Sequence, residues 1–153
     1  MTFAMSPDHV PDDFDWVAAQ AKCSTESMFE QLRTRIRADV QHRNGVFNHD
    51  DQWRFEFHDD GDEFEVVRLV SSGTAQPAGR HSPPRVTASV RFVRNGRRIH
   101  VQGEDVDVEF VAVVTLDPTG QCLFAVGEVF YAEWQIRRMA LEQLFFEESD
   151  DAE

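Results

Sequence analysis

The stretch that decides the fold is residues 85–126, RVTASVRFVRNGRRIHVQGEDVDVEFVAVVTLDPTGQCLFAV. At its start Val86, Ala88, Val90 and Phe92 alternate with polar residues, which is the period of a half-buried β-strand. Three turn signals divide the remainder, and the segments between them keep the same alternation. The stretch therefore predicts four antiparallel strands in a meander.

The first turn signal is Asn95-Gly96, a pair that readily adopts the two positive-φ positions of a type I′ turn. Such a turn pairs Phe92 with Ile99 and Arg91 with His100. Apolar residues then lie opposite apolar residues, which supports the register because a shift by one residue would reverse the faces.

The second turn signal begins at Gly103 and suits a two-residue turn of type II′. The third is Asp117-Pro118-Thr119-Gly120, in which Pro fits the second turn position and Gly fits a left-handed bulge. A three-residue loop there pairs Leu116 with Cys122. Both hairpins again place apolar residues on one face.

The N-terminal half predicts helical structure from about residue 12 to residue 43, where apolar residues recur at helical spacing. Ser24 can cap a new helix, so the segment is either one bent helix or two helices in series. Asn44-Gly45 is expected to end it with a left-handed cap.

A further hairpin follows the helical segment. Residues 53–58 alternate aromatic and polar side chains, and Asp60-Gly61 is a second type I′ signal that pairs Phe57 with Phe64. Residues 71–84 contain three prolines and two glycines and are expected to form a long connection rather than a domain boundary.

Residues 128–147 are expected to form a final helix with two apolar stripes. The docking stripe consists of Phe130, Trp134, Leu141, Leu144 and Phe145. The second stripe, on nearly the opposite side, supplies the interface candidates Ala132, Ile136, Met139 and Phe146. Because one stripe is enough to dock a helix on a sheet, the second predicts self-association.

These elements predict an α+β fold with an N-terminal helix, a six-stranded antiparallel meander sheet and a C-terminal helix. We expect a flexible arm over residues 1–11, one domain over 12–147 and an acidic tail over 148–153. By element order alone, the fold is similar to cystatin-like folds and to helix-grip folds. The lack of a clear strand before the first helix counts against the second likeness.

Composition limits the function classes. The net charge is −13, from 28 acidic and 15 basic side chains, so the field repels phosphate backbones and a nucleic-acid partner is not expected. No apolar run approaches the ~20 residues that span a bilayer, so a membrane partner is not expected either. Cys23 and Cys122 form no CxxC pair, which favours two reduced thiols in a cytoplasmic protein.

Motifs for cofactors and metals are absent. The acidic run Asp59–Glu63 lacks the alternate spacing of a calcium loop, and the six histidines show no HxxxH or HExxH spacing. No GxSxG, P-loop or Rossmann glycine pattern occurs. We therefore expect no metal and no cofactor.

One polar constellation remains as a candidate ligand site. The derived registers place three polar residues side by side on the polar sheet face and two more in the next row, giving the candidates Arg91, His100, Asp107, Arg98 and Glu109. The alternative interpretation of these residues is a solvated face with weak ion pairs. A ligand-binding or acid–base role would use the histidine as the titrating group.

Two functions follow from these patterns. The preferred one is a non-enzymatic binding or interaction module that acts as a homodimer or with a protein partner, because of the two-striped last helix. The alternative is a small-molecule-binding protein or small enzyme that uses the polar sheet face at Arg91, His100 and Asp107. A third idea, a small acidic chaperone for a secreted partner, rests on size and charge alone.

Overall fold

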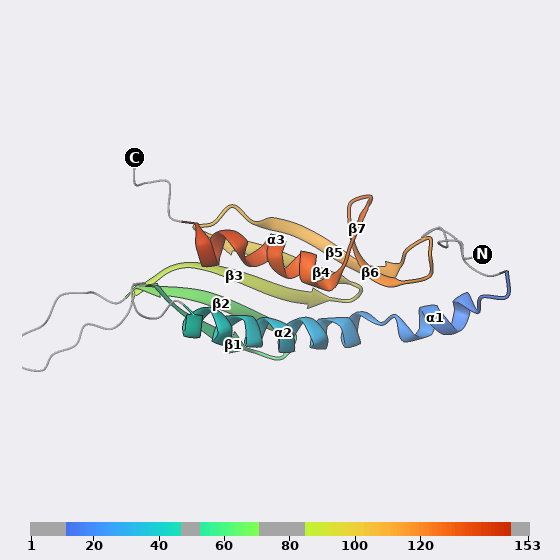
Figure 1. The fold of residues 1–153 in the computed structure, drawn as a ribbon, viewed down its shortest axis with the longest axis horizontal. Helices are drawn as coiled ribbons and strands as arrows, with labels where there is room; N and C mark the ends of the chain where they lie inside the picture. The colour runs from blue at the N-terminus through green and yellow to red at the C-terminus, as the bar shows by residue number, and fades with distance from the viewer. Residues whose placement is uncertain (1–11, 47–52, 71–84, 148–153) are drawn as a thin grey trace, which may run out of the picture.

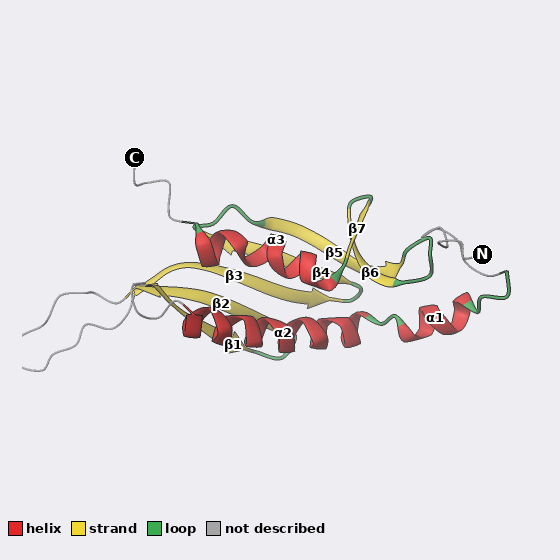
Figure 2. Ribbon diagram, in the orientation of Figure 1, coloured by secondary structure: helices red, strands yellow, loops and turns green. Residues whose placement is uncertain are grey.

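The computed structural model describes residues 12–46, 53–70 and 85–147, and within these ranges the chain has an α+β fold (Figures 1 and 2). Predictions for residues 1–11, 71–84 and 148–153 lie outside the described residues. The helices are α1 (Trp16–Lys22), α2 (Thr25–Val46) and α3 (Glu133–Phe146). The strands are β1 (Trp53–Asp59), β2 (Glu63–Val70), β3 (Arg85–Asn95), β4 (Arg98–Glu104), β5 (Glu109–Leu116), β6 (Cys122–Val126) and β7 (Val129–Tyr131).

The strands form one antiparallel meander in the order β1-β2-β3-β4-β5-β6-β7, and α2 and α3 cover one face of it (Figure 1). Aromatic rings carry the contact between α2 and the sheet. The ring of Phe29 lies 5.0 Å from that of Phe64, which stacks at 4.7 Å on Phe92. All three side chains are buried, so the core lies between the helices and this face.

The sheet contains a seventh strand where the sequence analysis placed the start of the last helix. Residues 128–132 were expected to be helical, but Val129 pairs with Val126 and Tyr131 with Phe124. β-branched and aromatic residues favour strands, and this local preference competes with the helical pattern. A two-residue turn starts at Gly127, whose φ is 62°, and α3 begins only at Glu133.

Three of the predicted hairpins have a different register, and two of these three are displaced by two residues. In the β3–β4 hairpin Gly96, with φ 65°, is the first loop residue rather than the second, which is the position glycine takes in a type II′ turn. Phe92 therefore pairs with Val101 and not with Ile99. The Gly61 hairpin is displaced in the same way. A displacement by two residues preserves the faces, so the core is unaffected.

The predicted turn at Gly103 is wrong. Strand β4 continues through Glu104, and the N–H of Gly103 donates to the carbonyl of Val108 at 2.7 Å. A Cβ on Gly103 would meet the side chain of Val106 at 2.5 Å. Glycine is thus required for the close approach of the following loop, and not for a two-residue turn.

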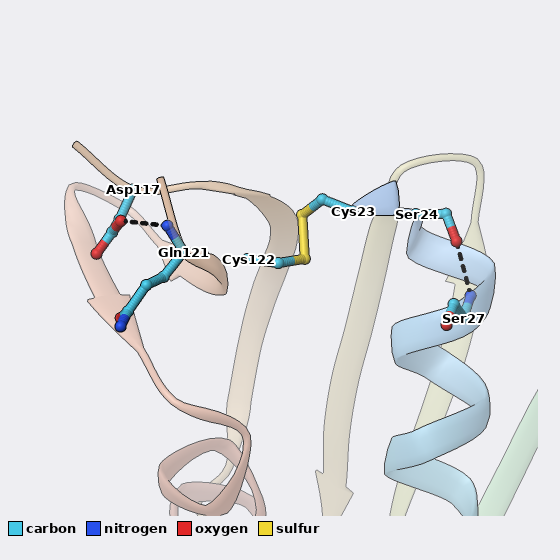
Figure 3. The surroundings of a disulfide bond; sticks show 6 residues. All are labelled: Cys23, Ser24, Ser27, Asp117, Gln121 and Cys122. Carbon is cyan, nitrogen blue, oxygen red and sulfur yellow. Dashed lines mark hydrogen bonds between the residues drawn. A yellow bond between two sulfur atoms is a disulfide. The ribbon is translucent and has the colours of Figure 1, made fainter. Parts of the chain in front are cut away.

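The β5–β6 hairpin confirms the third predicted turn. Leu116 pairs with Cys122, and Gly120 has φ 86°. The Oδ1 of Asp117 accepts a hydrogen bond from the N–H of Gln121 at 2.9 Å (Figure 3). It accepts a second from the N–H of Thr119, also at 2.9 Å. Desolvation acts to raise the pKa of Asp117, but these bonds and one from the Thr119 hydroxyl outweigh it and lower that pKa.

This shift predicts a pH dependence. Because the folded-state pKa of Asp117 lies below its ordinary value of 3.8, the carboxylate stabilises the fold above that value and loses this effect as pH falls through the folded pKa. Asp117→Asn should therefore destabilise the protein most near neutral pH, with a difference that shrinks below about pH 4. Urea unfolding at several pH values, with Glu128→Gln as the control, measures it. A difference independent of pH would contradict the assignment.

The N-terminal segment forms two helices in series, as one of the two predicted alternatives. The Oγ of Ser24 accepts from the N–H of Ser27 at 3.1 Å and caps α2 (Figure 3). The predicted stop at Asn44-Gly45 is wrong, because α2 continues to Val46. The Asn44 amide instead donates to the carbonyl of Phe55 at 2.9 Å and accepts from its N–H at 3.0 Å. This pair ties the end of α2 to β1.

Asn44→Ala should cost about 1–3 kcal/mol of stability, because it leaves two part-buried backbone groups of Phe55 without their partner. Gln41→Ala, an exposed position on the same helix, is the control for helix propensity and should be close to neutral. Urea midpoints compare the two variants. Equal losses would show that the amide pair contributes nothing specific.

The two cysteines are paired, which corrects the expectation of two reduced thiols. Cys23, in the junction between α1 and α2, bonds to Cys122 at the start of β6 across 99 positions of sequence (Figure 3). Their Cα atoms lie 5.4 Å apart. The pairing depends on the docking of α1 beside the β5–β6 hairpin, which cysteine spacing alone does not reveal.

Among the described helices, none is both long and apolar enough to cross a bilayer.

Candidate functional site

A groove of about 520 Å³ lies between the C-terminal half of α2 and α3. We term it the α2/α3 groove. The residues that line it come from both helices and include the last turn of each: Asp39, His42, Arg43, Val46, Trp134, Arg137, Arg138, Leu141, Glu142, Phe145 and Phe146. Leu141 and Phe145 are buried and form its apolar floor.

Large hydrophobic side chains gather at the groove and remain open to solvent. Trp134 is 54% exposed, Phe146 58% and Val46 56%. Single exposed hydrophobic residues are common on protein surfaces, but several around one hollow mark an interaction site. The groove is therefore the strongest candidate site among the described residues.

A charged brace connects the two walls of the groove. The Nη1 of Arg137 lies 2.8 Å from both carboxylate oxygens of Asp39, and its Nε donates to Glu133 at 3.0 Å. Desolvation acts to lower the pKa of Arg137, but Asp39 and Glu133 outweigh it and raise that pKa. Arg137 thus stays charged and holds α3 against α2.

A buried arginine closes one end of the groove. Arg43 is only 5% exposed, and its Nε donates to the carbonyl of Phe145 at 2.9 Å. Its guanidinium lies over the rings of Phe55 and Phe146, at 4.9 Å and 5.5 Å. The last carbonyls of a helix lack intrahelical partners and carry negative partial charge, so an arginine there is stabilising. Arg68 on β2 donates to the Leu144 carbonyl in the same way.

The structure divides the predicted interface stripe of α3. Ile136 is fully buried and faces the sheet, so it is not available to a partner; the outward orientation predicted for it is wrong. Met139 is half-buried against the core, and Ala132 is the N-cap. Phe146 is exposed, as predicted, and lies in the groove. Trp134, which was assigned to the docking stripe, is exposed instead.

The predicted row of Arg91, His100 and Asp107 does not form. With the observed registers, Arg91 lies opposite Gln102 and its guanidinium is 3.8 Å from Glu65. The His100 position is opposite Val93 on one side and Val111 on the other. Asp107 lies in the β4–β5 loop, where its N–H donates to Gln143 of α3 at 2.9 Å.

The remaining polar candidates also separate. Arg98 lies opposite Asn95 and Val113, whereas Glu109 lies opposite Gln102. The open sheet face carries a hollow of about 160 Å³, which is lined by Glu65, Ser89, Arg91, Gln102, Gly103 and Glu104. Arg91 is the only one of the five candidates that borders it.

Within residues 12–46, 53–70 and 85–147, no group of three or more His, Cys, Asp or Glu side chains is placed to hold a metal ion. The sequence pattern does not reveal the groove, because its residues belong to two helices that are distant in the chain. The only sequence signal for it is the excess of apolar residues on α3 beyond those that one docking face requires.

No protein-family model matches the chain, and neither the curated proteins nor the solved structures that were searched contain a match. The similarity to cystatin-like and helix-grip folds therefore stays a likeness of element order.

Proposed function

We propose that this protein is a non-enzymatic interaction module that binds an apolar segment of a polypeptide in the α2/α3 groove. The observation that carries the proposal is the gathering of Trp134, Phe146 and Val46 around the groove, each more than half exposed. Burying one such side chain is worth roughly 1.5–3 kcal/mol. An occupant that covers all three gains a substantial part of the free energy of a stable complex.

The residue types at the groove favour a polypeptide over a small molecule. Tryptophan and arginine dominate the binding energy of protein interfaces, and the groove presents Trp134 beside Arg138, whose side chain is 63% exposed. A groove between two helices also suits an amphipathic helix, which places its apolar face between the walls. Arg138 and Glu142, which hydrogen-bond to each other at 3.3 Å, both line the groove and are exposed, so charged groups of the partner can exchange with this pair.

The alternative is a small-molecule-binding protein or small enzyme that uses the polar sheet face. It has less support, because the registers separate His100 and Asp107 from Arg91. Arg91 also lies near two carboxylates, Glu63 and Glu65, which partly offset its charge. The hollow beside it nevertheless gives this alternative a definite location.

Native mass spectrometry of the protein as purified tests the proposal. The wild type should carry a second polypeptide, either another copy or a different chain, and Trp134→Glu with Phe146→Glu should release it. Val129→Glu is the matched control, because Val129 is 52% exposed and lies outside the groove. The proposal fails if the wild type is a bare monomer, if it carries only a small molecule, or if the groove variant keeps the polypeptide.

The disulfide also bears on where the protein acts. Disulfides persist in oxidising compartments and are rare in the cytoplasm, so Cys23–Cys122 argues against the predicted cytoplasmic location. We propose an oxidising environment for the folded protein. Intact mass before and after reduction, on protein isolated from its own cells with thiols blocked at lysis, tests this. Blocked thiols at Cys23 and Cys122 would contradict it.

A further inference from the structure

Helix α1 contributes an apolar surface that the described residues of its own chain leave exposed. It has seven residues and, among the described residues, none of them is buried. Trp16 is 63% exposed and Val17 58%. Helices this short are not stable in water by themselves and depend on packing against another surface. A partner surface that packs on the exposed side of α1 would therefore stabilise this helix.

The chain holds α1 at both ends. Before it, the ring of Phe14 packs on Gly120, where a Cβ would come within 2.6 Å of that ring. After it, Cys23 is bonded to Cys122. Both anchors lie on the β5–β6 hairpin, and α1 extends beyond this end of the sheet (Figure 1). The arrangement holds α1, with its exposed Trp16 and Val17, in a fixed position at this end of the sheet.

This helix does not reach the groove of its own chain. Helix α2 begins at Thr25, directly after the Cys23 anchor, whereas the groove begins at Asp39. Fourteen residues of helix separate the two, which is roughly 20 Å at 1.5 Å per residue. Figure 1 shows α1 and the C-terminal ends of α2 and α3 at opposite ends of the long axis.

The charges of the two surfaces are compatible with a contact between them. The approach to α1 carries three exposed carboxylates, at Asp12, Asp13 and Asp15. The groove contains three arginines and His42 against two carboxylates, in a protein whose net charge is −13. Because Arg137 pairs with Asp39 and Arg138 with Glu142, the groove is an aromatic hollow that is close to neutral in an otherwise acidic protein, and it repels an acidic, apolar helix less than the remaining surface does.

We propose that α1 of one copy docks in the α2/α3 groove of a second copy, and that the second copy returns the same contact. This inference rests on the proposed function, and it identifies the polypeptide bound in the α2/α3 groove as helix α1 of a second copy. Because α1 and the groove lie at opposite ends, a two-fold axis perpendicular to the long axis places each α1 over the other copy's groove. Such a contact closes on itself, as most soluble homodimers do.

Sedimentation equilibrium of four proteins tests the contact. The wild type should be a dimer, and both Trp16→Glu and the double variant Trp134→Glu with Phe146→Glu should weaken the dimer by about tenfold or more. Val129→Glu is the matched control and should stay dimeric. All changed side chains are largely exposed, and near-UV circular dichroism with urea unfolding verifies that each variant is folded.

Mixing the variants makes the test specific for an exchange between α1 and groove. Trp16→Glu retains an intact groove, and the Trp134→Glu, Phe146→Glu variant retains an intact α1. An equimolar mixture should therefore form heterodimers with one intact contact, more tightly than either variant alone. In a dimer built from groove against groove, or from α1 against α1, the mixture would not associate more tightly than the variants do alone.

The outcomes separate this inference from the proposed function. A monomeric wild type, a Trp16→Glu variant that dimerises like the wild type, or a mixture no tighter than its components would overturn the exchange. A different polypeptide that the groove variant releases, with Trp16→Glu retaining it, would overturn the exchange but leave the proposed function in place.

Discussion

Replacing both Cys23 and Cys122 by serine is expected to lower the free energy of unfolding by about 3–5 kcal/mol. The bond closes a loop across 99 positions, and the loop-closure entropy that it removes from the unfolded chain is worth about 4–5 kcal/mol for a loop of this length. It is also one of the two anchors of α1. Urea unfolding of the oxidised wild type and the double variant measures the loss.

Reduction provides the control for this prediction. Adding a thiol reductant should shift the wild-type urea midpoint towards that of the Cys23→Ser, Cys122→Ser variant and leave the variant's own midpoint unchanged. If the wild type unfolds at the same urea concentration with and without reductant, the two cysteines are not bonded.

The second large effect is expected in α3, where Ile136→Ala should cost about 2–5 kcal/mol. Ile136 is fully buried between α3 and the sheet, so the substitution removes apolar contacts and leaves a cavity. Trp134→Ala removes a larger side chain from the same helix, but Trp134 is 54% exposed and its loss should stay below about 1 kcal/mol. Urea unfolding measures both losses. A larger loss of stability for Trp134→Ala than for Ile136→Ala would show that Trp134 packs on the sheet and Ile136 faces outward, as the helical wheel predicted.

The sequence predicted the elements whose chemistry is local. Asp117-Pro118-Thr119-Gly120 contains a fixed φ, a left-handed glycine and a side-chain acceptor, and these together leave one register for the hairpin. Ser24 stands directly before a helical stripe and caps it. The α+β class and most of the sheet follow from such signals.

The registers of two hairpins were beyond the sequence pattern. Glycine after Asn95 or after Asp60 fits either position of a two-residue turn, and the two choices differ by two residues. Both choices keep apolar residues on the core face, so the hydrophobic pattern does not distinguish them. The polar face is sensitive to the difference, so Arg91 and His100 do not lie opposite each other. Asp107 is separated from them for another reason, because the turn predicted at Gly103 is wrong.

The groove depends on tertiary contacts that periodicity does not encode. The helical wheel included Val129 to Tyr131, which form a strand, and it placed Ile136 outward although this side chain is buried together with Leu141 and Leu144. Arg43 is buried although it is charged, because aromatic rings and a carbonyl at the end of α3 surround it. Its position becomes evident only when α2 and α3 are packed side by side.

The most direct test of the account is amide hydrogen exchange in α1, followed by mass spectrometry. It compares the wild type with the Trp134→Glu, Phe146→Glu variant at the same protein concentration. No residue of α1 is buried by the described parts of its own chain. Protection of the α1 amides that is lost in the variant therefore indicates contact with a partner surface. We expect α1 to be protected in the wild type and to exchange much faster in the variant, whose changes lie on a different helix. Equal exchange of α1 in the two proteins would contradict the docking of α1 in the α2/α3 groove.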